Sequence, residues 1–166
     1  LPTAAIEQHG PHCPVGLDTI NCLAVANRAA EEVADDVNVV VCPPQHFGSS
    51  DHHWPLPGVL TLRSTTFLMV LLELLDSLRR IGFRQVLILN GHGGNELLIQ
   101  QAARDFVLEN QDMRVVAGSY WDIARTALEA VPTDDANMMS DPISDVDGST
   151  SEASGTTHDS GLSSVL

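Results

Sequence analysis

The chain contains no lysine, and arginine is its only permanently basic residue. Its 166 residues carry 22 acidic side chains against 8 basic ones, which gives a net charge of -14. Nucleic acids and anionic membranes bind proteins through basic surfaces. Both are therefore poor partners for this chain, and we expect it to bind neither.

Cysteines and long apolar runs are also scarce. Cys13, Cys22 and Cys42 are odd in number and show no CxxC spacing, which argues against a disulfide framework and favours a reducing compartment. The longest apolar run, residues 67–75, includes Glu73 and is too short to span a bilayer. Because no basic-then-apolar leader opens the sequence, we expect a cytoplasmic domain.

Short apolar runs alternate with amphipathic stretches along most of the chain. The expected strands are residues 1–6, 37–42, 85–89 and 115–118, and the expected helices are residues 18–36, 64–81, 95–110 and 121–131. We expect Asp18-Thr19 and Asn95 to cap two of the helices and Gly82 to end a third. This alternation predicts an α/β domain with a parallel sheet covered by helices on both faces.

Apolar residues at helical spacing give the predicted core. They are Leu23, Ala26, Ala30, Val33, Phe67, Leu71, Leu74, Leu75, Leu78, Ile99, Ala102, Ala103 and Phe106. Residues 43–58 carry four prolines and three histidines and predict a long loop, which in compact domains is usually functional or disordered. Residues 133–166 are acidic and rich in Ser and Thr, so we expect a domain over 1–132 followed by a mobile or loosely packed extension.

Side chains that bind divalent metals follow two of the predicted strands. Glu7 and His9 come after the first strand, Asp18 begins the next helix, and His92 comes after the strand 85–89. Sites in open parallel sheets form at the carboxyl ends of strands, so we expect these side chains to meet. Two carboxylates and two imidazoles suit Zn²⁺ or Mn²⁺ better than Ca²⁺. A carboxylate that bridges two such ions would create a hydrolytic site.

Other interpretations of these residues stay open. Any one of the four alone is as well explained as a turn or capping residue. The glycines around His92 suggest a phosphate loop, and with it a doubly wound nucleotide-binding domain, only weakly, because GxGxxG and the P-loop lysine are missing. His12 fits a role in orienting a ligand better than a role as ligand. The histidines of the long loop are either solvated or, for one of them, directed at a substrate. They are His46, His52 and His53.

The sequence resembles the creatininase (creatinine amidohydrolase) family over about residues 1–125. The resemblance is carried by Glu7-Gln8-His9-Gly10-Pro11-His12-x-Pro14 with Asp18-Thr19, by Gly48-x-Ser50-x-x-His53 leading to Pro57-Gly58, and by Gly82-Phe83-Arg84 with Asn90-Gly91-His92-Gly93-Gly94-Asn95. It implies a three-layer α/β sandwich with a mostly parallel central sheet, and a homo-oligomer, commonly a hexamer. It also implies two divalent metals per chain, Zn and/or Mn, and hydrolysis of a C–N bond in a small cyclic or linear amide by metal-activated water.

The resemblance further implies roles for single residues. Glu7 and His9 would each bind one metal, Asp18 would bridge both, and His92 would complete one coordination shell. Ser50 and His53 would lie in the loop over the substrate as catalytic residues.

This chain departs from the family pattern at one ligand position. Creatininase proper has a glutamate where this chain has Gly94, and members with the Gly-Gly form use a later His…Glu-Thr-Ser segment. The nearest equivalent here begins at His158, our third catalytic candidate, and lacks the glutamate. Glu96 is an alternative ligand, and a catalytically incompetent family member that serves as a metal-binding or assembly subunit is an alternative function.

Overall fold

A three-stranded parallel sheet forms the centre of the protein in the computed structural model, which describes residues 1–129. Its strands are β1 (Pro2–Thr3), β2 (Gln85–Asn90) and β3 (Arg114–Ser119), in the spatial order β1-β2-β3. Pro2 lies opposite Leu89, and Val86 lies opposite Val115. Since all three strands run in the same direction, their carboxyl ends lie at one edge of the sheet.

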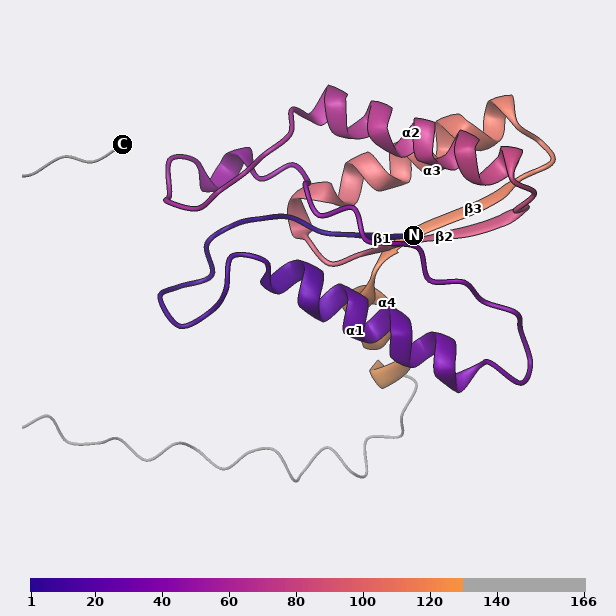
Figure 1. Ribbon diagram of the computed structural model, residues 1–166, viewed down its shortest axis with the longest axis horizontal. Coiled ribbons are helices and arrows are strands. Elements are labelled where there is room, and N and C mark those ends of the chain that lie inside the picture. The colour runs from indigo at the N-terminus through magenta and orange to yellow at the C-terminus, as the bar shows by residue number, and fades with distance from the viewer. Residues whose placement is uncertain (130–166) are drawn as a thin grey trace, which may run out of the picture. The chain divides into compact units, whose positions relative to one another are not determined.

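Helices cover both faces of this sheet. Figure 1 shows α2 (Ser64–Arg80) and α3 (Glu96–Glu109) on one face, and α1 (Leu17–Glu32) and α4 (Tyr120–Glu129) on the other. The predicted three-layer α/β architecture with a parallel sheet is therefore confirmed. Two short 3-10 turns, η1 (Asp51–His53) and η2 (Gly93–Asn95), lie in the long loop and after β2.

The main core lies between the sheet and the helix pair α2 and α3. Its buried members are Phe67, Leu71, Leu75, Val86, Ile88, Ile99, Ala102, Phe106 and Met113. Strand alternation is visible in β2, where Val86 and Ile88 are buried and Leu87 between them is 46% exposed. Burying each large apolar side chain contributes about 1.5–3 kcal/mol, and this core fixes α3, and with it the end of β2, against the sheet.

The chain after α2 follows the sequence prediction closely. α2 and α3 begin and end within a residue of the expected bounds, and β2, β3 and α4 lie where the sequence predicts them. Gly82 follows α2 with a φ of +110°, a conformation that side chains with a Cβ rarely adopt.

The first half of the chain contains the wrong predictions. Residues 37–42 form no strand, and Val37, Val39 and Val40 are 55%, 48% and 65% exposed. The chain reaches β1 only afterwards, at Gln45, whose backbone accepts from Ala4 N and donates to Pro2 O, both at 2.9 Å. The bridge between Thr3 and Gln45 is the one β-bridge along this edge of β1 within residues 1–129. The valines that precede Gln45 therefore have no strand to pair with.

The expected strand 1–6 and the expected caps also differ from the structure. β1 contains only Pro2 and Thr3, because the chain then leaves the sheet and Ile6 pairs antiparallel with Leu60. Gly16, not Asp18, precedes α1, which ends at Glu32, and Val33 is exposed. Asn95 precedes α3 but its side chain caps nothing; it donates to Ala4 O at 3.0 Å and accepts from Ser49 N at 2.9 Å. The side chain of Asn95, which the local pattern assigns to a helix cap, thus makes tertiary hydrogen bonds instead.

Three further predictions concern membrane-spanning helices, disulfide bonds and the extension after the domain. Among residues 1–129, no helix is long and apolar enough to cross a membrane. Cys13, Cys22 and Cys42 are free thiols. The predicted extension over 133–166, and His158 within it, lie outside the described residues.

Candidate metal centre

The site forms where β1 and β2 end side by side. Thr3 and Asn90 are paired across the two strands, and Gly91 N donates to Thr3 O at 2.9 Å. The Asn90 side chain then fixes the turn that follows, since its amide donates to His92 O at 2.7 Å and its carbonyl accepts from His92 N at 3.1 Å. β2 therefore delivers His92 to the edge of the sheet where the chain after β1 delivers Glu7.

Asp18 reaches the same place from the first turn of α1. The loop between β1 and α1 closes on itself, because Glu7 N donates to Val15 O at 3.0 Å. This closure returns the amino end of α1 to the strand ends, with Asp18 buried. Its burial there is unusual for a carboxylate, which is seldom buried without a partner.

The four predicted ligands lie together. Nδ1 of His92 is 3.2 Å from Oε1 of Glu7 and 3.1 Å from Oδ2 of Asp18. Nε2 of His9 is 3.0 Å from Oδ1 of Asp18 and 3.6 Å from Oε1 of Glu7. Donor atoms of Glu7, Asp18 and His92 lie within 4.8 Å of one another, a spacing that allows one ion to contact all three. His9 flanks this group and is not a member of it.

The electrostatics of the group favour a positive charge at its centre. Glu7, Asp18 and His92 are only 5%, 7% and 3% exposed. Burial by itself would lower the pKa of His92, but the adjacent carboxylates of Asp18 and Glu7 outweigh it and raise that pKa to about 9. Burial opposes ionisation of Glu7 as well, yet contacts with His92 and Ser50 hold the pKa of Glu7 below its usual value. The two carboxylates thus stabilise a positive charge beside them.

One buried oxygen of the group makes no hydrogen bond. Oδ2 of Asp18 forms an ion pair with Nδ1 of His92 at 3.1 Å, but it accepts no geometrically regular hydrogen bond within the described residues. A buried carboxylate oxygen without a hydrogen bond is costly. A metal ion coordinated by Oδ2 would remove that cost, so the residues present fit a divalent metal.

The long loop covers the group with two of the predicted catalytic residues. The hydroxyl of Ser50, which is fully buried, donates to Oε2 of Glu7 at 2.9 Å and lies 3.2 Å from Nε2 of His92. Nε2 of His53 lies 3.5 Å from Oε1 of Glu7, and the His53 side chain is 32% exposed. Ser50 is therefore placed to orient the ligands, and His53 lies between them and solvent.

Sequence reasoning did not separate His52 from the other loop histidines. In the structure His52 joins Glu7 and His53 in a second group of potential ligands, and its ring stacks on that of His92 with the centroids 5.5 Å apart. The sequence held one signal for His52: the loop carries an additional histidine in a chain that has a glycine, Gly94, at a ligand position of the family.

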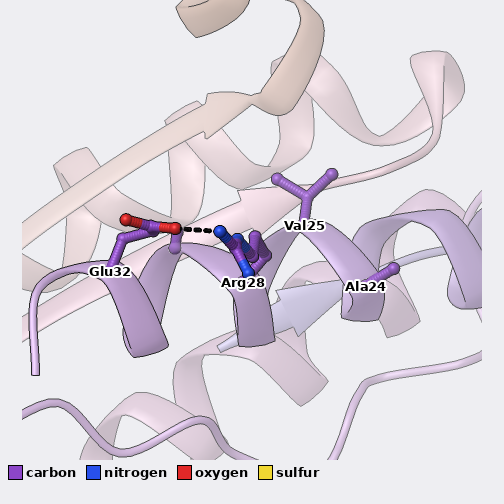
Figure 2. Close-up of a pocket in the computed structure, with 5 residues that line it drawn as sticks. Ala24, Val25, Arg28 and Glu32 are labelled. Atoms are coloured by element: carbon purple, nitrogen blue, oxygen red, sulfur yellow. Dashed lines mark hydrogen bonds and ion pairs between the residues drawn. The ribbon is translucent and has the colours of Figure 1, made fainter.

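The remaining candidates belong to neither group of potential ligands within residues 1–129. His12 is exposed, and Nδ1 of His46 is 3.4 Å from Oγ1 of Thr19. Glu96 belongs to neither group of potential ligands found among residues 1–129. A surface hollow on the carboxyl-terminal half of α1, lined by Ala24, Val25, Arg28, Ala29 and Glu32, is crossed by the Arg28–Glu32 ion pair (Figure 2). None of its lining residues belongs to either group of potential ligands.

Comparison with known proteins links this geometry to one family. The family model for creatinine amidohydrolase matches residues 1–158. A creatinine amidohydrolase of Pseudomonas putida is 30% identical over 138 residues, covering 75% of this chain and 50% of the relative. A mycofactocin precursor peptide peptidase of Mycolicibacterium smegmatis is 33% identical over 114 residues, covering 68% of this chain and 46% of the relative. The chain thus spans half or less of the length of these relatives.

Solved structures show the same similarity. A mutant creatininase described as "Zn-Zn type" superposes with a TM-score of 0.66 at 28% identity, covering 75% of this chain and 52% of the other. A structure described as "Creatininase Mn" superposes with a TM-score of 0.65 at 27% identity, covering 74% and 51%.

Proposed function

The chain belongs to the creatininase family, and from this premise we propose that it is a metal-dependent amidohydrolase that cleaves a C–N bond of a small cyclic or linear amide. The observation that carries the proposal is the buried group of Glu7, Asp18 and His92, with an oxygen of Asp18 that lacks a hydrogen-bond partner. Within residues 1–129 this oxygen accepts no hydrogen bond, which supports a further ligand at that position.

In the proposed site, Glu7, Asp18 and His92 would hold one divalent ion, and His9, which contacts the other oxygen of Asp18, would hold a second. The mixture of carboxylate and imidazole ligands suits Zn²⁺ or Mn²⁺. Names of related structures that mention zinc pairs and manganese support this choice of metals. A carboxylate with one oxygen toward His92 and the other toward His9, as in Asp18, is suited to bridge two ions, and we include a second ion in the proposal.

Each neighbouring side chain then has a defined task. A divalent metal in such a site supplies a water of lowered pKa and polarises a carbonyl. Ser50 holds the carboxylate of Glu7 in place through its 2.9 Å hydrogen bond. His53 would carry a proton to the leaving nitrogen, a role supported by its half-buried position 3.5 Å from Glu7. His158 stays a further candidate for that role.

The wider assignments belong to the proposal too. We take the substrate to be a small-molecule amide; a relative named for creatinine supports this, and one named for a precursor peptide supports an amide bond as the target. We propose a cytoplasmic homo-oligomer, a hexamer by resemblance to the family, and a domain that ends near residue 132.

Metal-loaded protein offered creatinine and short peptides, with products followed by mass spectrometry, tests the proposal. We expect hydrolysis of at least one amide, and a loss of at least about 100-fold in Glu7→Gln and Asp18→Asn, because removing even an outer partner of a metal ligand costs 10–100-fold. His12→Ala, which changes an exposed histidine that belongs to neither group of potential ligands, is the matched control. Absence of bound divalent metal, with hydrolysis unchanged in both carboxylate variants, would refute it.

Gly94 favours a second candidate function. A family member without a carboxylate at this position could keep the fold and one metal, and serve as a binding or assembly subunit. Metal titration separates the two functions: two ions per chain with turnover support the enzyme, and a single ion without amidase activity supports the subunit.

A further inference from the structure

Asn95 is a fully buried polar residue that neither helix capping nor metal binding explains. Its side chain caps no helix, and it belongs to neither group of potential ligands within residues 1–129. Its amide nitrogen donates to the backbone oxygen of Ala4 at 3.0 Å, and its amide oxygen accepts from the backbone nitrogen of Ser49 at 2.9 Å. One side chain therefore ties the long loop to the chain that leaves β1.

Gly48 leaves the space that this amide occupies. A Cβ at position 48 would lie 2.4 Å from Oδ1 of Asn95 and 2.4 Å from the backbone oxygen of Ala4. Real Cβ atoms essentially never approach other atoms so closely. Any side chain at position 48 would therefore force the Asn95 amide or the loop to move, and the two fit each other because this position is glycine.

The loop backbone that Asn95 holds contacts a predicted metal ligand. The backbone oxygen of Ser49 lies 3.0 Å from Nε2 of His92. A carbonyl oxygen can only accept a hydrogen bond, so Nε2 carries the hydrogen in this contact. The Ser50 hydroxyl, 3.2 Å from the same nitrogen, donates to Glu7 and can likewise accept from Nε2. The nitrogen left to bind an ion is Nδ1, which lies 3.2 Å from Glu7 and 3.1 Å from Asp18.

We propose that Asn95 is a positioning residue of the metal centre, which acts through the backbone of Ser49 to set His92 for binding through Nδ1. Histidines that bind metals almost always donate their other ring N–H to a carboxylate, a backbone carbonyl or water, which fixes the tautomer and the ring orientation. Asn95 also donates its own backbone N–H to the backbone oxygen of His92 at 3.1 Å. It thus holds both the backbone of this ligand and the group that receives the ring N–H. This inference rests on the proposed function, because it takes His92 as a ligand of the first ion.

The tautomer of His92 can be measured without any substitution. In ¹⁵N NMR spectra of the Zn²⁺-loaded full-length protein, we expect His92 to carry a proton on Nε2 and the metal on Nδ1. Because the ring is buried and Nε2 is hydrogen-bonded, this proton should exchange slowly with water and give a resolved resonance. Zn²⁺ on Nε2 of His92, with the proton on Nδ1, would overturn the proposal whether or not any variant folds.

Two substitutions then test Asn95 itself, with folding checked by circular dichroism. Asn95→Ala removes both side-chain hydrogen bonds, so we expect the Kd for Zn²⁺ to rise by about 10–100-fold and the Nε2 proton resonance of His92 to be lost. Asn95→Asp keeps an oxygen for the backbone nitrogen of Ser49 and should retain that resonance. Ile99→Ala is the matched control, since it opens a fully buried position one turn further along α3. It should leave the Kd and the resonance unchanged.

The outcomes separate this inference from the proposed function. An unchanged Kd and an unchanged Nε2 resonance in folded Asn95→Ala would overturn the role of Asn95 and leave the metal centre intact. Loss of the resonance in folded Asn95→Asp would overturn it too, because the bond to Ser49 would then not hold the ring. An equal loss of affinity in Ile99→Ala would show that general destabilisation explains the effect, which also overturns the role. Failure of the unaltered protein to bind Zn²⁺ would overturn the proposed function itself.

Discussion

Replacing Ser50 by alanine tests whether the long loop positions the metal ligands. The Ser50 side chain is fully buried, and its hydroxyl is the only group within the described residues that hydrogen-bonds Oε2 of Glu7, at 2.9 Å. The substitution removes one donor and leaves a charged oxygen buried without it. Hydrogen bonds to charged groups contribute about 1.5–3 kcal/mol, so we expect the metal-free protein to lose that much free energy of unfolding.

The same substitution should weaken metal binding. Without Ser50 the Glu7 carboxylate is free to rotate away from His92, and groups that orient metal ligands typically contribute 10–100-fold in affinity. We therefore expect the Kd for Zn²⁺, measured by competition with a chromophoric chelator, to rise by about 10–100-fold. Urea unfolding in the presence of a strong chelator measures the stability change separately.

Ser49→Ala is the matched control for this experiment. Ser49 precedes Ser50 and is also buried, but its hydroxyl only contacts that of Ser64, at 3.4 Å. We expect a small change in stability and an unchanged Zn²⁺ affinity. If Ser50→Ala binds Zn²⁺ as tightly as the unaltered protein, Ser50 does not position Glu7, and the geometric argument for the loop is wrong.

Three further substitutions test the core and the packing around the site. Phe67→Ala, at a fully buried position, should lower the free energy of unfolding by about 3–5 kcal/mol, measured in urea; a loss below about 1 kcal/mol would contradict the assigned core. Gly94→Ala should cost about 1–3 kcal/mol through overpacking, because its Cβ would meet a backbone oxygen at 2.3 Å; an unchanged melting temperature would contradict that contact. Burial raises the pKa of the Cys22 thiol to about 11. The unfolded chain therefore releases this proton at lower pH than the folded protein does, and the free energy of unfolding should fall as pH rises from about 9 to 11. The expected loss is roughly 3 kcal/mol, at 1.36 kcal/mol per pKa unit. Cys22→Ala should fall less over that range, and equal slopes would refute the assignment.

Periodicity predicted the elements that local pattern determines. α2 and α3 carry wide apolar stripes, here Phe67, Leu71 and Ile99, and these residues are buried as expected. The helix stop at Gly82 was also predictable, since a glycine is needed where φ is positive. The same reasoning failed for Val37, Val39 and Val40, because an apolar run forms a strand only where a partner edge is free, and sequence pattern does not show which edges are used.

The sequence alone determined the kinds of side chain available at the strand ends, and therefore a divalent metal rather than a nucleotide as the expected ligand. Glu7, Asp18 and His92 could be named because parallel strands and the following helix must begin or end at one edge of the sheet. Only the tertiary structure decided how the long loop packs onto that edge. The role inferred for Ser50 depends on that packing, which brings the loop against Glu7 and His92 from segments far apart in sequence. The missing Cβ of Gly94 lets Ser49 and His92 approach this position closely.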